Sequence, residues 1–200
     1  VTTRRNNTLD LGGQYVAAAV AGRMTSVSAS KSLTRKAITG FTAVKERRSK
    51  DEKNADAQSG LLVVEDTGAI IQLRHAITTA AAAPTFAASE AEISVVRAKQ
   101  KMVASLVETI DQQIIGQVVA DGNAELVIAS TVRGVLQTLV DDKQIVGFTN
   151  VVAETKAYNP TIIAVSFNYR PAFPVNYIDI TFAVDITNNA LINTTNNSGV

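Results

Sequence analysis

The chain has 200 residues, 46% of them hydrophobic and 5% aromatic, and its formal net charge of +1 gives no overall attraction to nucleic acid or to an anionic membrane. Cysteine is absent, which excludes disulfides, thiolate catalysis and cysteine-ligated metals. No apolar run reaches the ~20 residues of a membrane helix and no signal peptide is visible, so we expect neither nucleic acid nor membrane as a partner.

The first quarter of the chain predicts one helix between polar segments. Residues 1–10 are polar and basic and are expected to form an extended arm. Because the first residue is Val and not Met, we also expect further sequence before it. The alanine-rich run after the arm favours a helix over Gln14–Arg23. Residues 24–40 indicate a loop with a helical turn near Leu33–Ile38, and the mixed charges of residues 45–56 indicate a solvated loop.

A β-hairpin is expected next. Leu61–Val64 is a short apolar run, and Asp66-Thr67-Gly68 is a turn signal. The residues from Ala69 to Thr78 then alternate between apolar and partly polar side chains, as in a half-buried strand. Residues 80–88, interrupted by a proline, are expected to form a linker.

Two long helices follow the linker. Ser89 and Glu92 have the spacing of a capping box at the start of the first helix. Its inward face is predicted from apolar residues at helical spacing: Ile93, Val96, Val103, Leu106, Val107, Ile110 and Ile114. Asn123 is the expected cap of a second helix that runs to about Asp141. The inward residues of this helix are predicted to be Leu126, Val127, Val132, Leu136 and Leu139.

The last third of the chain predicts three strands, over Ile145–Thr155, Thr161–Arg170 and Tyr177–Ile186. In the third, Ile180 and Phe182 share the apolar face, and we expect both to be buried beneath the first long helix. The chain then ends in a polar tail rich in Asn and Thr. These elements predict an α+β fold: a mixed sheet with two long helices packed on one face, and extended polar N- and C-terminal arms. The expected divisions are an arm over 1–10, a core domain over 11–186 and an arm over 187–200.

Candidate catalytic groups are few. His75 is the only histidine and lies on the inward face of its strand, so it is interpreted as structural, without a metal partner. Gly12-Gly13 lacks the spacing of a phosphate-binding loop. The adjacent carboxylate pairs and arginine pairs are interpreted as solvated surface, although the arginines could touch an acidic partner: Asp51-Glu52, Asp141-Asp142, Arg4-Arg5 and Arg47-Arg48. We therefore expect no enzyme, no catalytic residue, no cofactor and no metal.

The order of segments resembles the C-terminal domain of contractile tail sheath proteins of phages and pyocin-like injection machines. The resemblance runs from about Leu9 to Ile186. It rests on an alanine-rich helix (VAAAVAGRM), a segment ending in glycine (SLTRKAITGF), a strand ending LRHAITT, the S-x-x-E helix with VVRAKQKM, and a final segment YRPAFPVNYIDITFAVDI. Each piece is a degenerate pattern, so the resemblance depends on the order and spacing of the pieces.

The resemblance implies a structural subunit. Sheath subunits stack as hexameric rings in a helical homopolymer around an inner tail tube, and contraction drives the tube through an envelope. The sheath uses no cofactor, and its further partners would be baseplate and terminator proteins. The implied location is the virion tail, assembled in the host cytoplasm. The alternatives left open are another tail or baseplate component and, from a different class, an enzyme with an unrecognised site.

Two sets of residues become candidates for assembly contacts. The linking arm, which would pair with a neighbouring subunit's sheet, is expected within the C-terminal tail at Thr187, Asn188, Asn189, Ala190, Leu191, Ile192 and Asn193; the alternative is a frayed terminus. Residues 1–9 would be the reciprocal arm. The tube-facing candidates are exposed charges, for which ordinary solvated surface is the alternative: Arg97, Lys101, Asp141, Asp142 and Lys143.

Overall fold

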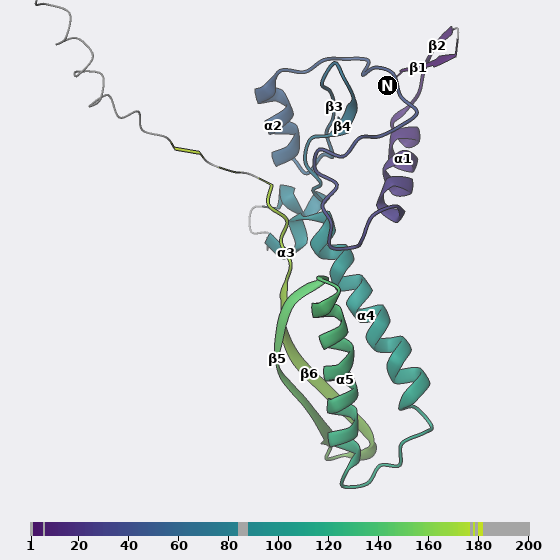
Figure 1. Cartoon of the computed structure of the whole chain (residues 1–200), viewed down its shortest axis with the longest axis vertical. Coiled ribbons are helices and arrows are strands. Elements are labelled where there is room, and N and C mark those ends of the chain that lie inside the picture. Colours follow the sequence, from purple (N-terminus) through teal and green to yellow (C-terminus); the bar gives the residue numbers. More distant parts are fainter. Residues whose placement is uncertain (1, 6, 84–87, 177, 179, 182–200) are drawn as a thin grey trace, which may run out of the picture.

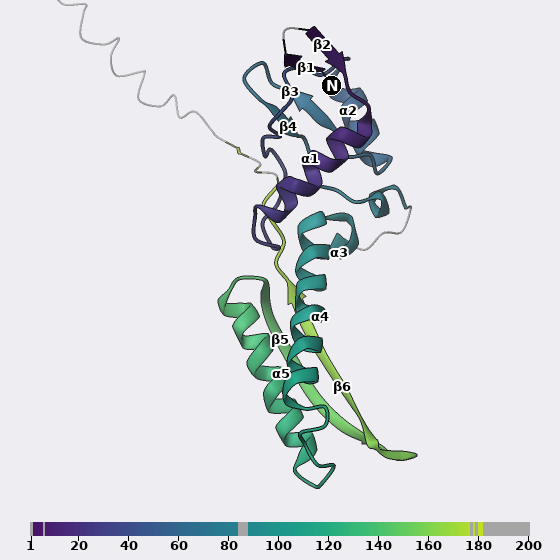
Figure 2. The ribbon, with the colours of Figure 1, turned by 90° about the vertical axis from the view of Figure 1, so that its right-hand side faces the viewer.

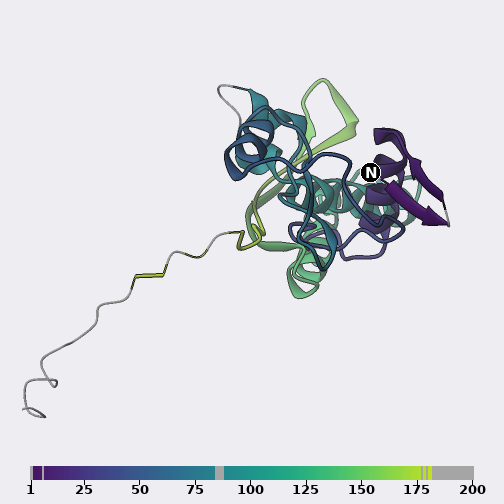
Figure 3. The ribbon, with the colours of Figure 1, turned by 90° about the horizontal axis from the view of Figure 1, so that it is seen from above.

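The computed structural model describes residues 2–5, 7–83, 88–176, 178 and 180–181. The protein is elongated, with two parts stacked along its long axis (Figure 1). The N-terminal part contains α1, α2 and the strands β1 to β4, and the C-terminal part contains α4, α5, β5 and β6. Viewed along the long axis, the β1–β2 hairpin projects from the side of the body away from the segment that follows β6 (Figure 3).

The N-terminal part differs from the sequence prediction at two segments. The expected extended arm is an antiparallel hairpin of β1 (Thr2–Arg5) and β2 (Asn7–Asp10). The charged segment expected to be a solvated loop contains α2 (Lys50–Gln58). Its start is a complete capping box, in which the Glu52 amide donates to Ser49 Oγ at 3.3 Å and the Ser49 amide donates to Glu52 Oε2 at 2.8 Å. The predicted helix after the arm is confirmed as α1 (Gly13–Thr25).

The core of the N-terminal part forms around the short hairpin of β3 (Val64–Asp66) and β4 (Ile71–Leu73). A turn is present near Leu33–Ile38, with the Lys36 amide donating to the Leu33 carbonyl at 3.0 Å, but it is not helical because Arg35 has a φ of 58°. The segment also runs beside β4. The Arg35 amide donates to the Leu73 carbonyl at 2.7 Å, and the Ile38 amide donates to the Ile71 carbonyl at 2.8 Å. The buried core cluster combines residues of α1, this segment and the hairpin: Val20, Leu33, Ile38, Leu73 and Ala76.

Two short helical segments, η1 (Thr79–Ala82) and α3 (Ala88–Ala91), lead into α4 (Ile93–Gln113). The capping box expected from Ser89 and Glu92 is wrong: Glu92 is an extended residue between α3 and α4, and it forms a β-bridge with Ile77. The buried stripe of α4 is also rotated from the expected one. Val103 and Val107 are 48% and 52% exposed, and the buried side chains are Ser94, Val95, Ala98, Met102 and Leu106.

The C-terminal part packs α4 and α5 (Ala124–Asp141), which lie side by side (Figure 2), against a ribbon of β5 (Ile145–Lys156) and β6 (Asn159–Pro171). The strands are antiparallel, with Phe148 opposite Tyr169 and Ala153 opposite Val165. The core cluster takes side chains from α4, α5 and β5: Met102, Leu106, Val132, Leu136, Leu139, Ile145 and Val151. The inward positions predicted for Val132, Leu136 and Leu139 are confirmed, whereas Leu126 is 67% exposed.

The α+β class is confirmed, but the single mixed sheet is not. The described residues form three separate antiparallel sheets of two strands each. Of the third expected strand, Ile178, Ile180 and Thr181 lie in no strand, and Ile180 is 77% exposed, so its burial beneath α4 is wrong for the chain alone. Phe182 and the rest of that strand lie outside the described residues.

Candidate functional site

The β5–β6 ribbon is the part of the described structure best suited to binding another chain through its backbone. β5 and β6 have 12 and 13 residues, and among the described residues each pairs only with the other. Two outer groups of β5 are already bound by α5, since Arg133 donates to the Val151 carbonyl at 2.9 Å and the Thr155 amide donates to Glu125 at 2.6 Å. The outer edge of β6 pairs with no other described strand, so its backbone groups can accept an added strand. The ribbon face away from α5 also exposes apolar side chains, at Val146, Val152 and Ile162. The ribbon thus offers the long backbone edge of β6 beside a partly apolar face.

The segment that leaves β6 is tied to the body at Glu92. The Asn176 side-chain amide donates to Glu92 Oε2 at 3.0 Å. Glu92 Oε1 accepts from the hydroxyls of Ser32 at 3.0 Å and Ser94 at 3.2 Å. Glu92 is 7% exposed, so one buried carboxyl joins three segments that are far apart in sequence. The segment after β6 is therefore held at Asn176, beside the start of α4.

Burial decides the protonation of this carboxyl. Removing the carboxylate from water raises the pKa of Glu92 above its ordinary value, and the hydrogen bonds from Ser32, Asn176 and Ser94 oppose that rise. Asn176 Oδ1 is buried without a hydrogen-bond partner. If the amide of Asn176 is turned over, this oxygen can accept a hydrogen bond from the protonated Glu92 carboxyl, so the site can hold either protonation state.

The predicted arm residues lie outside the described residues, from Thr187 through Ile192 to Asn193. The last described residues before them, Ile178 and Ile180, are 78% and 77% exposed. The pairing of the arm with a neighbour therefore stays a prediction.

Arg97, a tube-facing candidate, is engaged within the chain. Its guanidinium donates to the carbonyl oxygens of Met24 at 2.5 Å, Val27 at 3.1 Å and Ser28 at 3.5 Å. These carbonyls belong to the last turn of α1 and the turn after it, where a helix leaves acceptors without internal partners. Burial lowers the pKa of Arg97, which remains a cation. Arg97 therefore braces α4 against α1.

The other tube-facing candidates are exposed. Lys101 follows Arg97 by one helical turn on α4. Asp141 ends α5, and Asp142 and Lys143 form the turn before β5; the next residue, Gln144, donates to Ser28 Oγ at 2.9 Å. The structure thus brings the end of α5 and the Arg97 side of α4 to one loop, residues 26–30. Contact of these charges with a tube stays a prediction.

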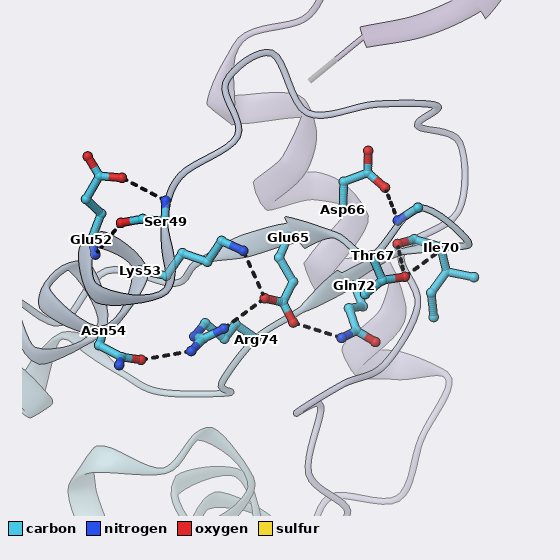
Figure 4. Close-up of polar contacts among 11 residues, drawn as sticks. Ser49, Glu52, Lys53, Asn54, Glu65, Asp66, Thr67, Ile70, Gln72 and Arg74 are labelled. Carbon is cyan, nitrogen blue, oxygen red and sulfur yellow. Dashed lines mark hydrogen bonds and ion pairs between the residues drawn. The ribbon is translucent and has the colours of Figure 1, made fainter.

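A second polar cluster, centred on Glu65, was not identified from the sequence. Its carboxylate accepts from Gln72 at 2.9 Å, from Arg74 at 3.0 Å and from Lys53 at 3.5 Å, as Figure 4 shows. Burial acts to raise the pKa of Glu65, but the hydrogen bonds from Gln72 and Arg74 and the charges of Lys53 and Arg74 lower it overall. Arg74 also donates to Asn54 Oδ1 at 2.9 Å, so the cluster fastens α2 to the β3–β4 hairpin.

A basic hollow of about 710 Å³ opens beside this cluster. Its wall includes three cationic side chains, Arg35, Lys50 and Arg74, together with His75 and one carboxylate, Glu65. Burial and the nearby Arg74 lower the pKa of His75, which favours the neutral imidazole. His75 thus lines a polar hollow instead of facing a core.

The remaining sequence candidates have local roles. Gly12 is the N-cap residue of α1, consistent with its interpretation as a helix start. Arg47 pairs with Asp66 at 3.0 Å and Arg48 pairs with Asp56 at 2.5 Å, so both find acidic partners within the chain. In the part of the chain that the structure describes, no group of three or more His, Asp or Glu side chains could hold a metal ion. No helix there is long and apolar enough to cross a membrane.

No family model matches the chain. It is 34% identical over 181 residues to the tail sheath protein of Mycobacterium phage Bxz1. The aligned region covers 90% of this chain and 30% of that protein. The chain therefore spans under a third of the curated relative. Over those residues the resemblance to tail sheath proteins is confirmed.

Solved structures show the same fold. The sheath tail protein from Listeria innocua matches with a TM-score of 0.72 and 18% identity, covering 87% of this chain and 42% of that one. The sheath tail protein from Desulfitobacterium hafniense has a TM-score of 0.71 at 15% identity, covering 87% and 41%. The contracted helical sheath of the anti-feeding prophage also has a TM-score of 0.71, at 13% identity, covering 92% and 54%.

Proposed function

Because the chain resembles tail sheath proteins in sequence and in fold, we propose that it is part of a structural subunit of a contractile tail sheath. The subunit polymerises as stacked hexameric rings around an inner tube and drives the tube out on contraction. The observation that carries the proposal is the 34% identity to a named tail sheath protein over 90% of the chain. The proposed location is the phage tail.

The β5–β6 ribbon supplies the proposed means of linkage. The outer edge of β6 has the length and the backbone groups to accept an arm from a neighbouring copy, whereas α5 binds part of the β5 edge. We take residues 11–186 as the body, 187–200 as the outgoing arm and 1–10 as the reciprocal arm. Backbone pairing along such edges would keep neighbouring subunits joined while their bodies rotate.

The inner tube is the second proposed partner. Lys101 and the Asp141–Lys143 turn present exposed charges that can separate from a polar surface without exposing apolar area. Each such pair contributes only about 0–1 kcal/mol, so their effect depends on repetition over many subunits. Arg97 donates to the carbonyls of Met24 and Val27 within the chain and so holds α4, which carries Lys101, against the end of α1.

Electron microscopy and sedimentation of the purified full chain test the proposal. We expect rings, tubes or sheath-like polymers, and we expect truncation after Ile186 to leave a folded subunit that assembles poorly. A chain that stays monomeric at high concentration in both low and physiological salt would contradict the proposed function. Normal polymers from the truncated chain would contradict only the arm.

A further inference from the structure

The basic hollow defined above carries unbalanced positive charge. Its one carboxylate, Glu65, is already bound by Lys53, Gln72 and Arg74. Arg35 and Lys50 are exposed on its wall, and neither forms an ion pair with a described residue. The Nε of Arg74 is buried there without a hydrogen-bond partner among the described residues. The hollow therefore has donors and positive charge for a group that the chain itself does not supply.

Arg35 is held in place by its backbone. Its φ of 58° lies in the left-handed region, which an arginine adopts only when the surroundings fix it. The fixing contact is the hydrogen bond from its amide to the Leu73 carbonyl at 2.7 Å. Leu73 is fully buried in the core, so the base of the Arg35 side chain is anchored at the rim of the hollow. An anchored cation loses less entropy on binding an anion than a free surface arginine does.

The two described parts of the molecule differ in charge. The described residues up to 91 contain 12 Lys and Arg against 8 Asp and Glu, whereas residues 92–176 contain 7 against 8. In space these stretches lie largely at opposite ends of the long axis (Figure 1). The far end of the C-terminal part exposes three carboxylates and one cation, Lys156; the carboxylates are Asp111 in the last turn of α4, Asp121 in the α4–α5 loop and Glu154 near the end of β5. We call these three carboxylate residues the acidic end.

We propose that the basic hollow receives the acidic end of a second copy of this chain, so that copies stack head to tail. The contact joins two different surfaces, hollow to end, and so can repeat without closing into a pair. A polar helical polymer needs contacts of this kind. The inference rests on the proposed sheath function and adds to it a charge-based contact between layers, separate from the arms. Complementary charges also fix the direction of stacking, because like ends repel.

Charge reversal tests the contact in the full chain. Variant A carries Arg35→Glu and Lys50→Glu, and variant B carries Asp111→Lys and Glu154→Lys; no hydrogen bond or ion pair of these four side chains is described. Lys31→Glu is the matched control, an exposed reversal on the N-terminal part outside the hollow. Each variant alone should need about tenfold more protein to assemble than the wild type, as expected for two lost charge pairs. The control should assemble normally.

Mixing the variants gives the decisive result. An equimolar mixture of A and B should regain near-normal assembly, because the acidic hollow of A fits the basic end of B and the reverse. Wild-type assembly should also weaken as salt is raised. Unchanged assembly of A and B, a mixture that fails like its components although circular dichroism shows both folded, or assembly indifferent to salt would overturn the inference. A wild type that does not assemble at all would instead contradict the proposed function.

Discussion

Replacing Arg97 with alanine should loosen the join between α1 and α4. The guanidinium donates to three carbonyls at the end of α1, and those of Val27 and Ser28 lie at 3.1 Å and 3.5 Å. A hydrogen bond from a charged donor contributes about 1.5–3 kcal/mol when well formed, and a cation at a helix C-terminus adds about 0.3–1 kcal/mol. Arg97 is only half-buried and one contact is long, so we expect a loss of about 2 kcal/mol in total.

Urea and thermal unfolding measure this loss. In a domain of this size, about 2 kcal/mol corresponds to a fall in Tm of roughly 4–8 °C. Lys101→Ala, one turn further along the same helix, is the matched control, and an exposed residue of this kind should change stability by less than about 0.5 kcal/mol. Arg97→Lys should recover only part of the loss, because an ammonium cannot reach several carbonyls in one plane.

A change of under about 0.5 kcal/mol for Arg97→Ala would refute the bracing role. The result also bears on the tube. If Arg97 supports the fold, a reversal at Arg97 disturbs assembly by weakening the subunit, whereas a reversal at Lys101 tests tube contact alone.

Three further predictions concern stability. Leu136 is fully buried, so Leu136→Ala should cost about 2–5 kcal/mol in urea unfolding, whereas Leu126→Ala, at a position 67% exposed, should cost under about 0.5 kcal/mol. The raised pKa of Glu92 means that the folded chain binds a proton more readily than the unfolded chain, so the stability from this group is full below the ordinary glutamate pKa and is lost as pH rises through the folded pKa. Glu92→Gln should therefore be at least as stable as the wild type at neutral pH, with the gap closing in acid; a variant that is less stable at neutral pH would contradict this. Gly60 has φ 75°, and an added Cβ would lie 2.9 Å from the Thr79 carbonyl oxygen, so Gly60→Ala should lower stability by about 1 kcal/mol or more, as a Tm shift would show.

The periodic elements of the C-terminal part could be predicted from the sequence because their signals are local. Helical spacing identified α5 with its inward Val132 and Leu136, alternation identified β6, and β5 was predicted as a strand over Ile145–Thr155. The order of segments was enough to indicate the tail sheath family. The capping box of α2 was also readable, at Ser49 and Glu52, but the run of charges around it favoured a loop.

The sequence pattern gave wrong predictions where two interpretations of the same segment were equally regular. Apolar residues lie on two stripes of α4, and only the position of α5 and the ribbon decides that Met102 is buried and Val103 is not. Ser89 and Glu92 have capping-box spacing, yet a β-bridge to Ile77 makes Glu92 an extended residue. In each case a contact made by a distant segment outweighs the local preference.

The sequence by itself determined the fold class, the two long helices, the ribbon strands and the family resemblance, because each depends on neighbouring residues or on segment order. Only the tertiary structure decided which polar side chains contact each other across distant segments. Arg97 meets Met24 across 73 residues of chain, and Glu92 meets Asn176 across 84. The basic hollow likewise needs Arg35, Lys50 and Arg74 to converge from three segments. Such contacts depend on how the elements pack, and the periodicity of a single element carries no information about the distant partner that its polar side chains will meet.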